Sequence, residues 1–150
     1  MKFSFANKKT LPILMKENII IEKQTMTAKE AIDKVGAMMV KSGYVKKGYI
    51  AGMHKRDEDL SVYLGNLLAI PHGVHDVKDE IIASGMAVLI VPEGIDWHGN
   101  VAKVIVGLAG KDGEHMTILA NLATVFAELE TAEKLAESVD VDWIYQSLTQ

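Results

Sequence analysis

Two apolar runs in the middle of the chain, residues 84–91 and 101–109, constrain the fold more than any other feature. Both are rich in β-branched residues and are bounded by Pro, Gly or Asp, which is typical of β-strands. Their nearly continuous hydrophobicity indicates strands that are covered on both faces. A shorter run, 67–70, is closed by Pro71 and predicts another strand.

Helical periodicity surrounds this strand-rich middle. The segment Thr27-Ala28-Lys29-Glu30 matches a capping box, and apolar residues at helical spacing follow it until Gly43, which suits a left-handed helix stop. A second helix is predicted over 46–57. After Asp112-Gly113 the helical period returns, and the remaining helices are predicted at 115–126, 132–138 and 142–148, the last capped by Asp140.

This order of elements predicts an α/β fold, with a central, largely mixed β-sheet flanked by helices. The chain has 150 residues, of which 49% are hydrophobic and three are proline. That length and composition favour a single folded, layered domain over residues 1–150.

Composition also excludes several classes of function. There is no cysteine, and therefore no disulfide, thiolate nucleophile or cysteine metal site. With 16 basic and 20 acidic side chains the net charge is −4, which does not favour nucleic-acid binding. No run approaches the roughly 20 apolar residues of a membrane helix, and 1–10 lacks the apolar run of a signal peptide. We therefore expect a cytoplasmic protein.

Two of the five histidines stand in positions that suit chemistry. His72 follows Pro71 where a predicted strand emerges into a loop, a place where a rigid scaffold aims functional groups. The alternative for His72 is an ordinary surface histidine in a turn. His115 lies in the first turn of a predicted helix, where unpaired N–H groups attract anions. The alternative for His115 is a half-buried histidine at the edge of the core.

The other histidines are less informative. His54 on a helix surface and His98 in a turn are expected to be exposed or to pack in the turn. His72, His75 and Asp76 could form part of a metal site, but Gly73 after Pro71 disfavours the helical spacing that such a pair needs. We expect no metal and no cofactor. Phosphate-binding glycine loops and the G-x-S-x-G elbow are also absent from the sequence.

The segment 63–73, read Tyr-Leu-Gly-Asn-Leu-Leu-Ala-Ile-Pro-His-Gly, resembles the IIA component of the sugar phosphotransferase system, mannitol/fructose type. Arg56 upstream and Gly113-Glu114-His115 downstream fit the same family in the same order. Further matches at 43–45 and 92–94 favour its mannitol-specific members. The similarity extends over about residues 27–148.

The resemblance implies a role for each matching residue. His72 would be the histidine that accepts a phosphoryl group from the phosphocarrier protein HPr and passes it to a cysteine of the IIB component. His115 would assist the transfer and Arg56 would bind the phosphoryl group. Asn66, Gly73 and Val74 would lie next to this set, with Asn66 in place of an acidic residue and Val74 in place of a threonine.

The resemblance also implies the partners. Because this chain has no cysteine, the acceptor cysteine is expected on a separate IIB polypeptide, associated with a membrane permease that itself binds the sugar. A mainly apolar patch around His72 would meet HPr, whose basic rim would suit an acidic domain. The alternative is a regulatory module of the same fold that binds partners according to its phosphorylation state.

Overall fold

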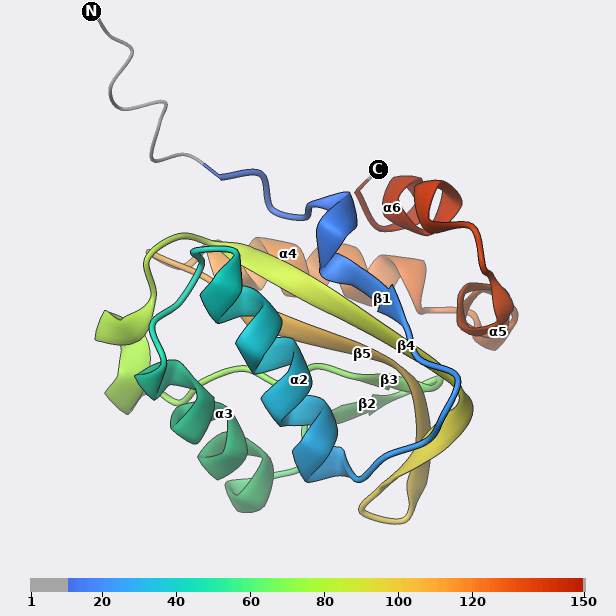
Figure 1. Cartoon of the computed structure of the whole chain (residues 1–150), viewed down its shortest axis with the longest axis horizontal. Helices are drawn as coiled ribbons and strands as arrows, with labels where there is room; N and C mark the ends of the chain where they lie inside the picture. The colour runs from blue at the N-terminus through green and yellow to red at the C-terminus, as the bar shows by residue number, and fades with distance from the viewer. Residues whose placement is uncertain (1–10, 150) are drawn as a thin grey trace, which may run out of the picture.

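A five-stranded mixed sheet forms the centre of the computed structural model, which describes residues 11–149 (Figure 1). The sheet has the order β1-β4-β5-β3-β2. The pairs β1–β4 and β3–β5 are parallel, whereas β4–β5 and β2–β3 are antiparallel, so the predicted mixed sheet is confirmed. The strands are β1 (Ile19–Ile21), β2 (Tyr63–Gly65), β3 (Leu68–Ala69), β4 (Gly85–Trp97) and β5 (Asn100–Ala109).

Both faces of β4 are buried, as its continuous hydrophobicity predicted. Successive side chains of a strand point to opposite faces, and Val88 and Ile90 accordingly pack in one apolar cluster while Ala87 and Leu89 pack in the other. The strand is longer than the predicted run, because it continues past the exposed Pro92 to Trp97. The pairing with β5 shifts register between Ile90 and Ile95, which accommodates a residue that has no N–H.

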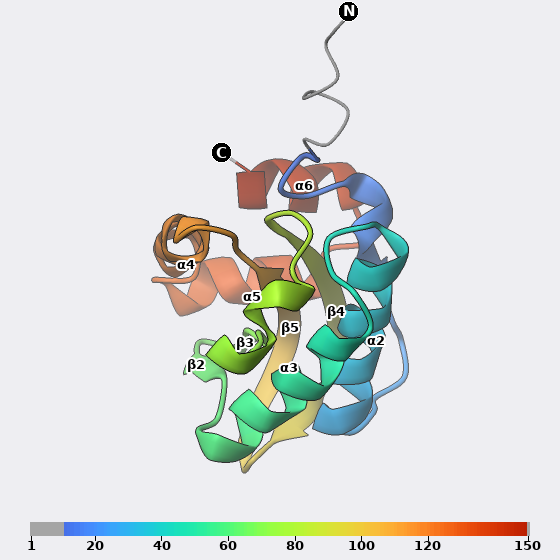
Figure 2. The ribbon, with the colours of Figure 1, turned by 90° about the vertical axis from the view of Figure 1, so that its left-hand side faces the viewer.

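Helices cover both faces of the sheet, as Figures 1 and 2 show. On one side lie α2 (Ala28–Lys41), α3 (Gly48–Asp59) and the 3₁₀ segment η2 (His75–Glu80). On the other side lie α4 (Glu114–Val125), α5 (Leu129–Glu137) and α6 (Val141–Thr149). This α/β architecture confirms the predicted fold class.

Local sequence signals correctly predicted both ends of α2 and the start of α6. The Thr27 hydroxyl accepts from the Glu30 N–H at 3.1 Å, and the Glu30 carboxylate accepts from the Thr27 N–H at 2.9 Å, so the capping box is present. The Asp140 carboxylate accepts from the Trp143 N–H at 3.1 Å at the start of α6. Gly43, with a φ of 88°, follows the end of α2.

The sequence patterns missed β1, β2 and both 3₁₀ segments, η1 (Lys16–Asn18) and η2. All four are short, and one or two turns or a three-residue strand have too few residues to show a clear period. The absence of a signal peptide concerns 1–10, which lie outside the described residues. Within 11–149 no helix has both the length and the hydrophobicity needed to cross a membrane.

Candidate functional site

The loop that carries His72 is fastened to the end of β5. It follows β3, and the Leu108 N–H donates to the Pro71 carbonyl at 2.9 Å, while His72 itself forms a parallel bridge with Leu108. From Leu108 the chain runs through Gly110 directly into α4. The sheet therefore brings His72 and the first turn of α4 to the same end of the molecule.

A backbone carbonyl determines which nitrogen of His72 is reactive. The His72 Nδ1 atom lies 2.7 Å from the Ile70 carbonyl oxygen. Because a carbonyl oxygen can only accept, Nδ1 carries the proton and Nε2 keeps its lone pair. The neutral imidazole thus presents Nε2 as a nucleophile.

His72 stands between two surface hollows. The first, which we call the His115 hollow, has a volume of about 360 Å³ and is lined by Val74, Gly110 and His115 among others. The second, the Arg56 hollow, has a volume of about 440 Å³ and includes Arg56 and Leu64 in its wall. His72, Met116 and Leu119 line both hollows. The fold therefore brings together all three side chains that the sequence singled out.

The surroundings of His72 favour its neutral form. Burial lowers the pKa of the imidazole, and the electrostatic influence of Arg56 and His115 lowers it further. The hydrogen bond to the Ile70 carbonyl works in the opposite direction but does not compensate. The pKa of His72 consequently lies below the ordinary histidine value, and the free lone pair is available at neutral pH.

His115 is half-buried in the first turn of α4, the positive end of the helix. Its approach to β5 depends on Gly110, where an added Cβ atom would lie 2.3 Å from the His115 backbone nitrogen. The connection is held by Ser84, whose hydroxyl donates to the Glu114 carboxylate and accepts from the Lys111 N–H. An imidazole and helix N–H groups at one place can stabilise an anion.

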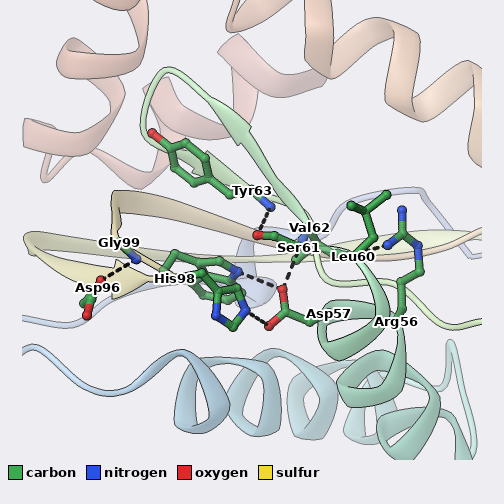
Figure 3. Close-up of polar contacts among 10 residues, drawn as sticks. Arg56, Asp57, Leu60, Ser61, Val62, Tyr63, Asp96, His98 and Gly99 are labelled. Carbon is green, nitrogen blue, oxygen red and sulfur yellow. Dashed lines mark hydrogen bonds and ion pairs between the residues drawn. The ribbon is translucent and has the colours of Figure 1, made fainter.

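Arg56 lies in the last turn of α3 and is partly buried. Its Nη1 atom donates to the carbonyl of Leu60, the C-cap residue, at 2.5 Å (Figure 3). A guanidinium has five N–H donors in a planar fork, so this contact orients the side chain and leaves it suited to bidentate binding of phosphate oxygens.

The turn after Arg56 is anchored by the buried carboxylate of Asp57 (Figure 3). This carboxylate accepts from the Val62 N–H at 3.0 Å, the Trp97 Nε1–H at 3.0 Å and the His98 Nε2 at 2.7 Å. Burial alone would raise the pKa of Asp57, but these hydrogen bonds and the nearby His98 lower it below the ordinary value. The network ties the end of α3 to the tip of the β4–β5 hairpin.

His54 and His98, which were expected at the surface, each contact an aspartate carboxylate. His98 was expected to be exposed or to pack in its turn, and its side chain is 50% exposed, yet the imidazole holds the buried Asp57. His54 was expected to be exposed, but its side chain is only 23% exposed and contacts the Asp33 carboxylate at 2.7 Å. Both acidic partners lie far away in the sequence, so local context could not reveal them.

The three residues expected next to the site occupy different places. Gly73 and Val74 line the His115 hollow. Asn66 lines neither hollow beside His72; its Nδ2 donates to the Phe126 carbonyl at 2.8 Å and to the Ala127 carbonyl at 3.3 Å at the end of α4. An amide can donate to these carbonyls, whereas a carboxylate could only face them unfavourably. His75 and Asp76 are exposed, and no group of three potential metal ligands gathers among residues 11–149.

Tyr49 contacts the His72 loop, although its sequence position showed only that it belongs to the buried face of α3. Its hydroxyl donates to the Leu108 carbonyl at 2.7 Å and accepts from the Gly73 N–H at 2.8 Å. The available signal was a tyrosine among apolar helix positions, since a buried hydroxyl needs a polar partner. That signal indicates a hydrogen bond but not its location.

Comparison with known proteins identifies the family. Residues 12–150 match the model of the family described as phosphoenolpyruvate-dependent sugar phosphotransferase system, EIIA 2. The chain belongs to this family. Its resemblance to the IIA components, first seen in the motifs around Arg56, His72 and His115, is thereby confirmed.

Named members of the IIA family agree with this assignment. The mannitol-specific IIA component of Staphylococcus aureus is 42% identical over 130 residues, covering 87% of this chain and 90% of the relative. The crystal structure of IIA mannitol from Escherichia coli is 28% identical with a TM-score of 0.82, covering 91% of this chain and 99% of that one. The Escherichia coli protein in complex with phosphorylated enzyme IIB also has a TM-score of 0.82 at 28% identity, covering 90% and 96%.

Proposed function

We propose that this protein is a phosphocarrier of a sugar phosphotransferase system, in which His72 accepts a phosphoryl group from phospho-HPr and passes it to a cysteine of a separate IIB component. The observation that carries the proposal is the state of His72. Its Nδ1–H is held by the Ile70 carbonyl, which leaves the Nε2 lone pair free between Arg56 and His115.

The reaction follows from this geometry. The Nε2 lone pair attacks phosphorus, and the bond between phosphorus and the donor atom of phospho-HPr breaks, its electron pair leaving with HPr. In a loose transition state the charge spreads over the equatorial oxygens, so catalysis is mainly a matter of positioning and electrostatic stabilisation. Arg56 supplies a planar cation, and His115 with the start of α4 supplies further positive potential. A thiolate of IIB then attacks the same phosphorus atom, and Nε2 leaves.

An exposed apolar face around His72 supports docking of protein partners. Leu64 and Met116, which line the hollows beside His72, are 58% and 62% exposed. Aromatic and apolar side chains at the centre of an interface are the usual anchors of protein association. We propose that HPr and IIB bind this face in turn, and the relative solved in complex with phosphorylated IIB supports that view.

The relatives also suggest the biological setting. Several of them are named mannitol-specific, so we propose mannitol or another polyol as the transported sugar. The protein would act in the cytoplasm and associate transiently with a membrane permease. The sugar would bind the permease and not this chain.

Phosphorylation with purified components tests the proposal. Incubation with phosphoenolpyruvate, enzyme I and HPr is expected to place one acid-labile phosphate on His72, detected by mass spectrometry and lost in His72→Gln. His54→Gln, at a histidine that lines neither hollow beside His72, should be labelled normally. Unlabelled wild-type protein, or a fully labelled His72→Gln, would contradict the proposal.

A second stage separates the carrier from a regulatory module. Phosphorylated protein mixed with a mannitol IIB is expected to lose its phosphate to the IIB cysteine. A stable complex with no onward transfer would instead indicate that the protein only reports phosphorylation state.

A further inference from the structure

We propose that Tyr49 is a positioning residue for His72: its hydroxyl holds the Gly73 N–H and thereby keeps the imidazole in the orientation that exposes Nε2. This inference rests on the proposed function for its effect on rate. Its effect on the imidazole itself can be measured without phosphotransfer.

The His72 loop is held by hydrogen bonds on both sides of the imidazole. Upstream of the imidazole, two backbone hydrogen bonds fasten the chain, from Ile70 N–H to Val62 and from Leu108 N–H to Pro71. Downstream, the residue next to His72 is a glycine, which has the greatest backbone freedom. The Gly73 N–H donates to the Tyr49 hydroxyl at 2.8 Å, and this bond restrains the loop on that side.

The Tyr49 hydroxyl can both donate and accept a hydrogen bond at this position. Tyr49 is 3% exposed, and burial raises its pKa to about 12, so the hydroxyl keeps its proton. That proton is donated to the Leu108 carbonyl at 2.7 Å, which leaves the oxygen lone pairs directed to accept from Gly73. One hydroxyl thus joins the end of β5 to the loop that follows His72.

The Tyr49 ring also packs closely against the backbone of Gly73. An added Cβ atom at Gly73 would lie 2.5 Å from Cε1 of the Tyr49 ring and 2.7 Å from Cγ2 of Val77. The loop therefore packs directly against the tyrosine ring. Tyr49 and Gly73 both line the His115 hollow. Ring and hydroxyl together define where the main chain beside His72 can lie, which in turn sets the contact between Nδ1 and the Ile70 carbonyl.

Tyr49→Phe tests the role, since it keeps the ring and removes the hydroxyl. We expect transfer from phospho-HPr to slow by about tenfold or more, because small misplacements of a reacting group are costly. We also expect nitrogen-15 spectra of the His72 ring to change from the Nδ1–H tautomer to a mixture with Nε2–H. The pKa of His72 should rise towards the ordinary value as the imidazole becomes more exposed.

Tyr44→Phe is the matched control. Tyr44 is equally buried, and its hydroxyl also donates to a backbone carbonyl, but that carbonyl belongs to Pro12 and not to the His72 loop. The control is expected to lose stability to a similar extent but to leave the transfer rate and the His72 spectrum unchanged.

Two results would overturn the proposal. One is a folded Tyr49→Phe protein whose His72 tautomer and titration match wild type, whatever its stability. The other is the same change of tautomer in Tyr44→Phe, which would show a general effect of lost packing. If wild-type protein is not phosphorylated, the proposed function fails, but the His72 spectra still decide the role of Tyr49.

Gly73→Ala provides a second route if Tyr49→Phe does not fold. The new methyl group would push the loop away from the tyrosine ring and lengthen the Gly73–Tyr49 contact from the other side. The same mixture of His72 tautomers is expected, and a spectrum identical to wild type would overturn the proposal.

Discussion

At the residue scale, the reactivity proposed for His72 depends on one carbonyl and on the groups beside it. The Ile70 oxygen leaves the Nε2 lone pair free, while burial and the electrostatic influence of Arg56 and His115 favour the neutral ring. These two effects are separable, because the first acts on the tautomer and the second on the pKa.

The pKa of His72 gives a first prediction. In a proton NMR titration the His72 ring is expected to titrate below the ordinary value of 6.5. Since the unfolded chain binds this proton more readily, the contribution of neutral His72 to stability is present above the unfolded pKa and is lost as the pH falls through the folded one. Arg56→Gln should raise the His72 pKa by removing a nearby positive charge. Titration at or above 6.5 in the wild type would contradict this account.

The geometry of Arg56 gives a second prediction. Arg56→Lys keeps the charge but replaces a planar fork by a hydrated point charge. Phosphotransfer is expected to slow by about a hundredfold, as when one donor to a transition-state oxygen is lost, while the thermal unfolding midpoint changes little. Lys55→Arg makes the converse change at a neighbouring exposed position and should leave the rate unaltered. The prediction fails if Arg56→Lys transfers phosphate as fast as wild type.

At the scale of elements, the turn between α3 and β2 determines where Arg56 lies. Asp57 binds the turn through Val62 and binds the β4–β5 hairpin through Trp97 and His98. The carbonyl that orients Arg56 belongs to Leu60 in the same turn. The hairpin therefore supports the turn that orients Arg56, which we propose binds the phosphoryl group, without contacting Arg56 in this network.

Asp57→Asn tests this support. The amide retains an acceptor but loses the charge-assisted bonds, so the free energy of unfolding should fall by about 1–3 kcal/mol at neutral pH. Because the folded pKa of Asp57 is lowered, its contribution is present above the unfolded carboxyl pKa and disappears as the pH falls through the folded pKa. Urea unfolding at neutral and acid pH would show the two proteins converging in stability. Asp59→Asn, which removes an exposed pair with Lys55, should change stability by about 0.5 kcal/mol or less.

At the scale of the whole molecule, the sheet gathers the reactive groups at one end and leaves an apolar surface around them. Leu64 comes from β2, Met116 and Leu119 from α4, and His72 lies between these elements. In the proposed phosphotransfer, a protein partner would surround the imidazole and exclude water from the transferred group.

Met116→Glu tests this docking face. Met116 is 62% exposed, so the substitution should leave stability nearly unchanged while a charge at the centre of the contact slows transfer from phospho-HPr by about tenfold. Val139→Glu, at an 84% exposed position between α5 and α6 that lines neither hollow, should transfer normally. Equal rates for the two variants would place the docking surface elsewhere.

Local sequence was sufficient for much of this protein. The spacing of apolar residues predicted most of the helices and the long strands. This is possible because the side chains that one helix or strand buries recur every few positions along the chain. The motif Ile-Pro-His-Gly, with Arg56 and His115 in order around it, identified the family and singled out three side chains that line the two hollows. The helix and strand signals each lie within one short segment, whereas the family resemblance combines three separated segments.

The tertiary structure decided how those segments act together. Strand register brought Leu108 beside the His72 loop, and only then could Tyr49 join the two. The bond between Asp57 and His98 likewise crosses 41 positions of sequence. The pKa of His72 and the place of Asn66 also depend on distant neighbours. Hydrogen bonds and electrostatic shifts act through space over a few ångströms, so they become defined only when packing sets those distances.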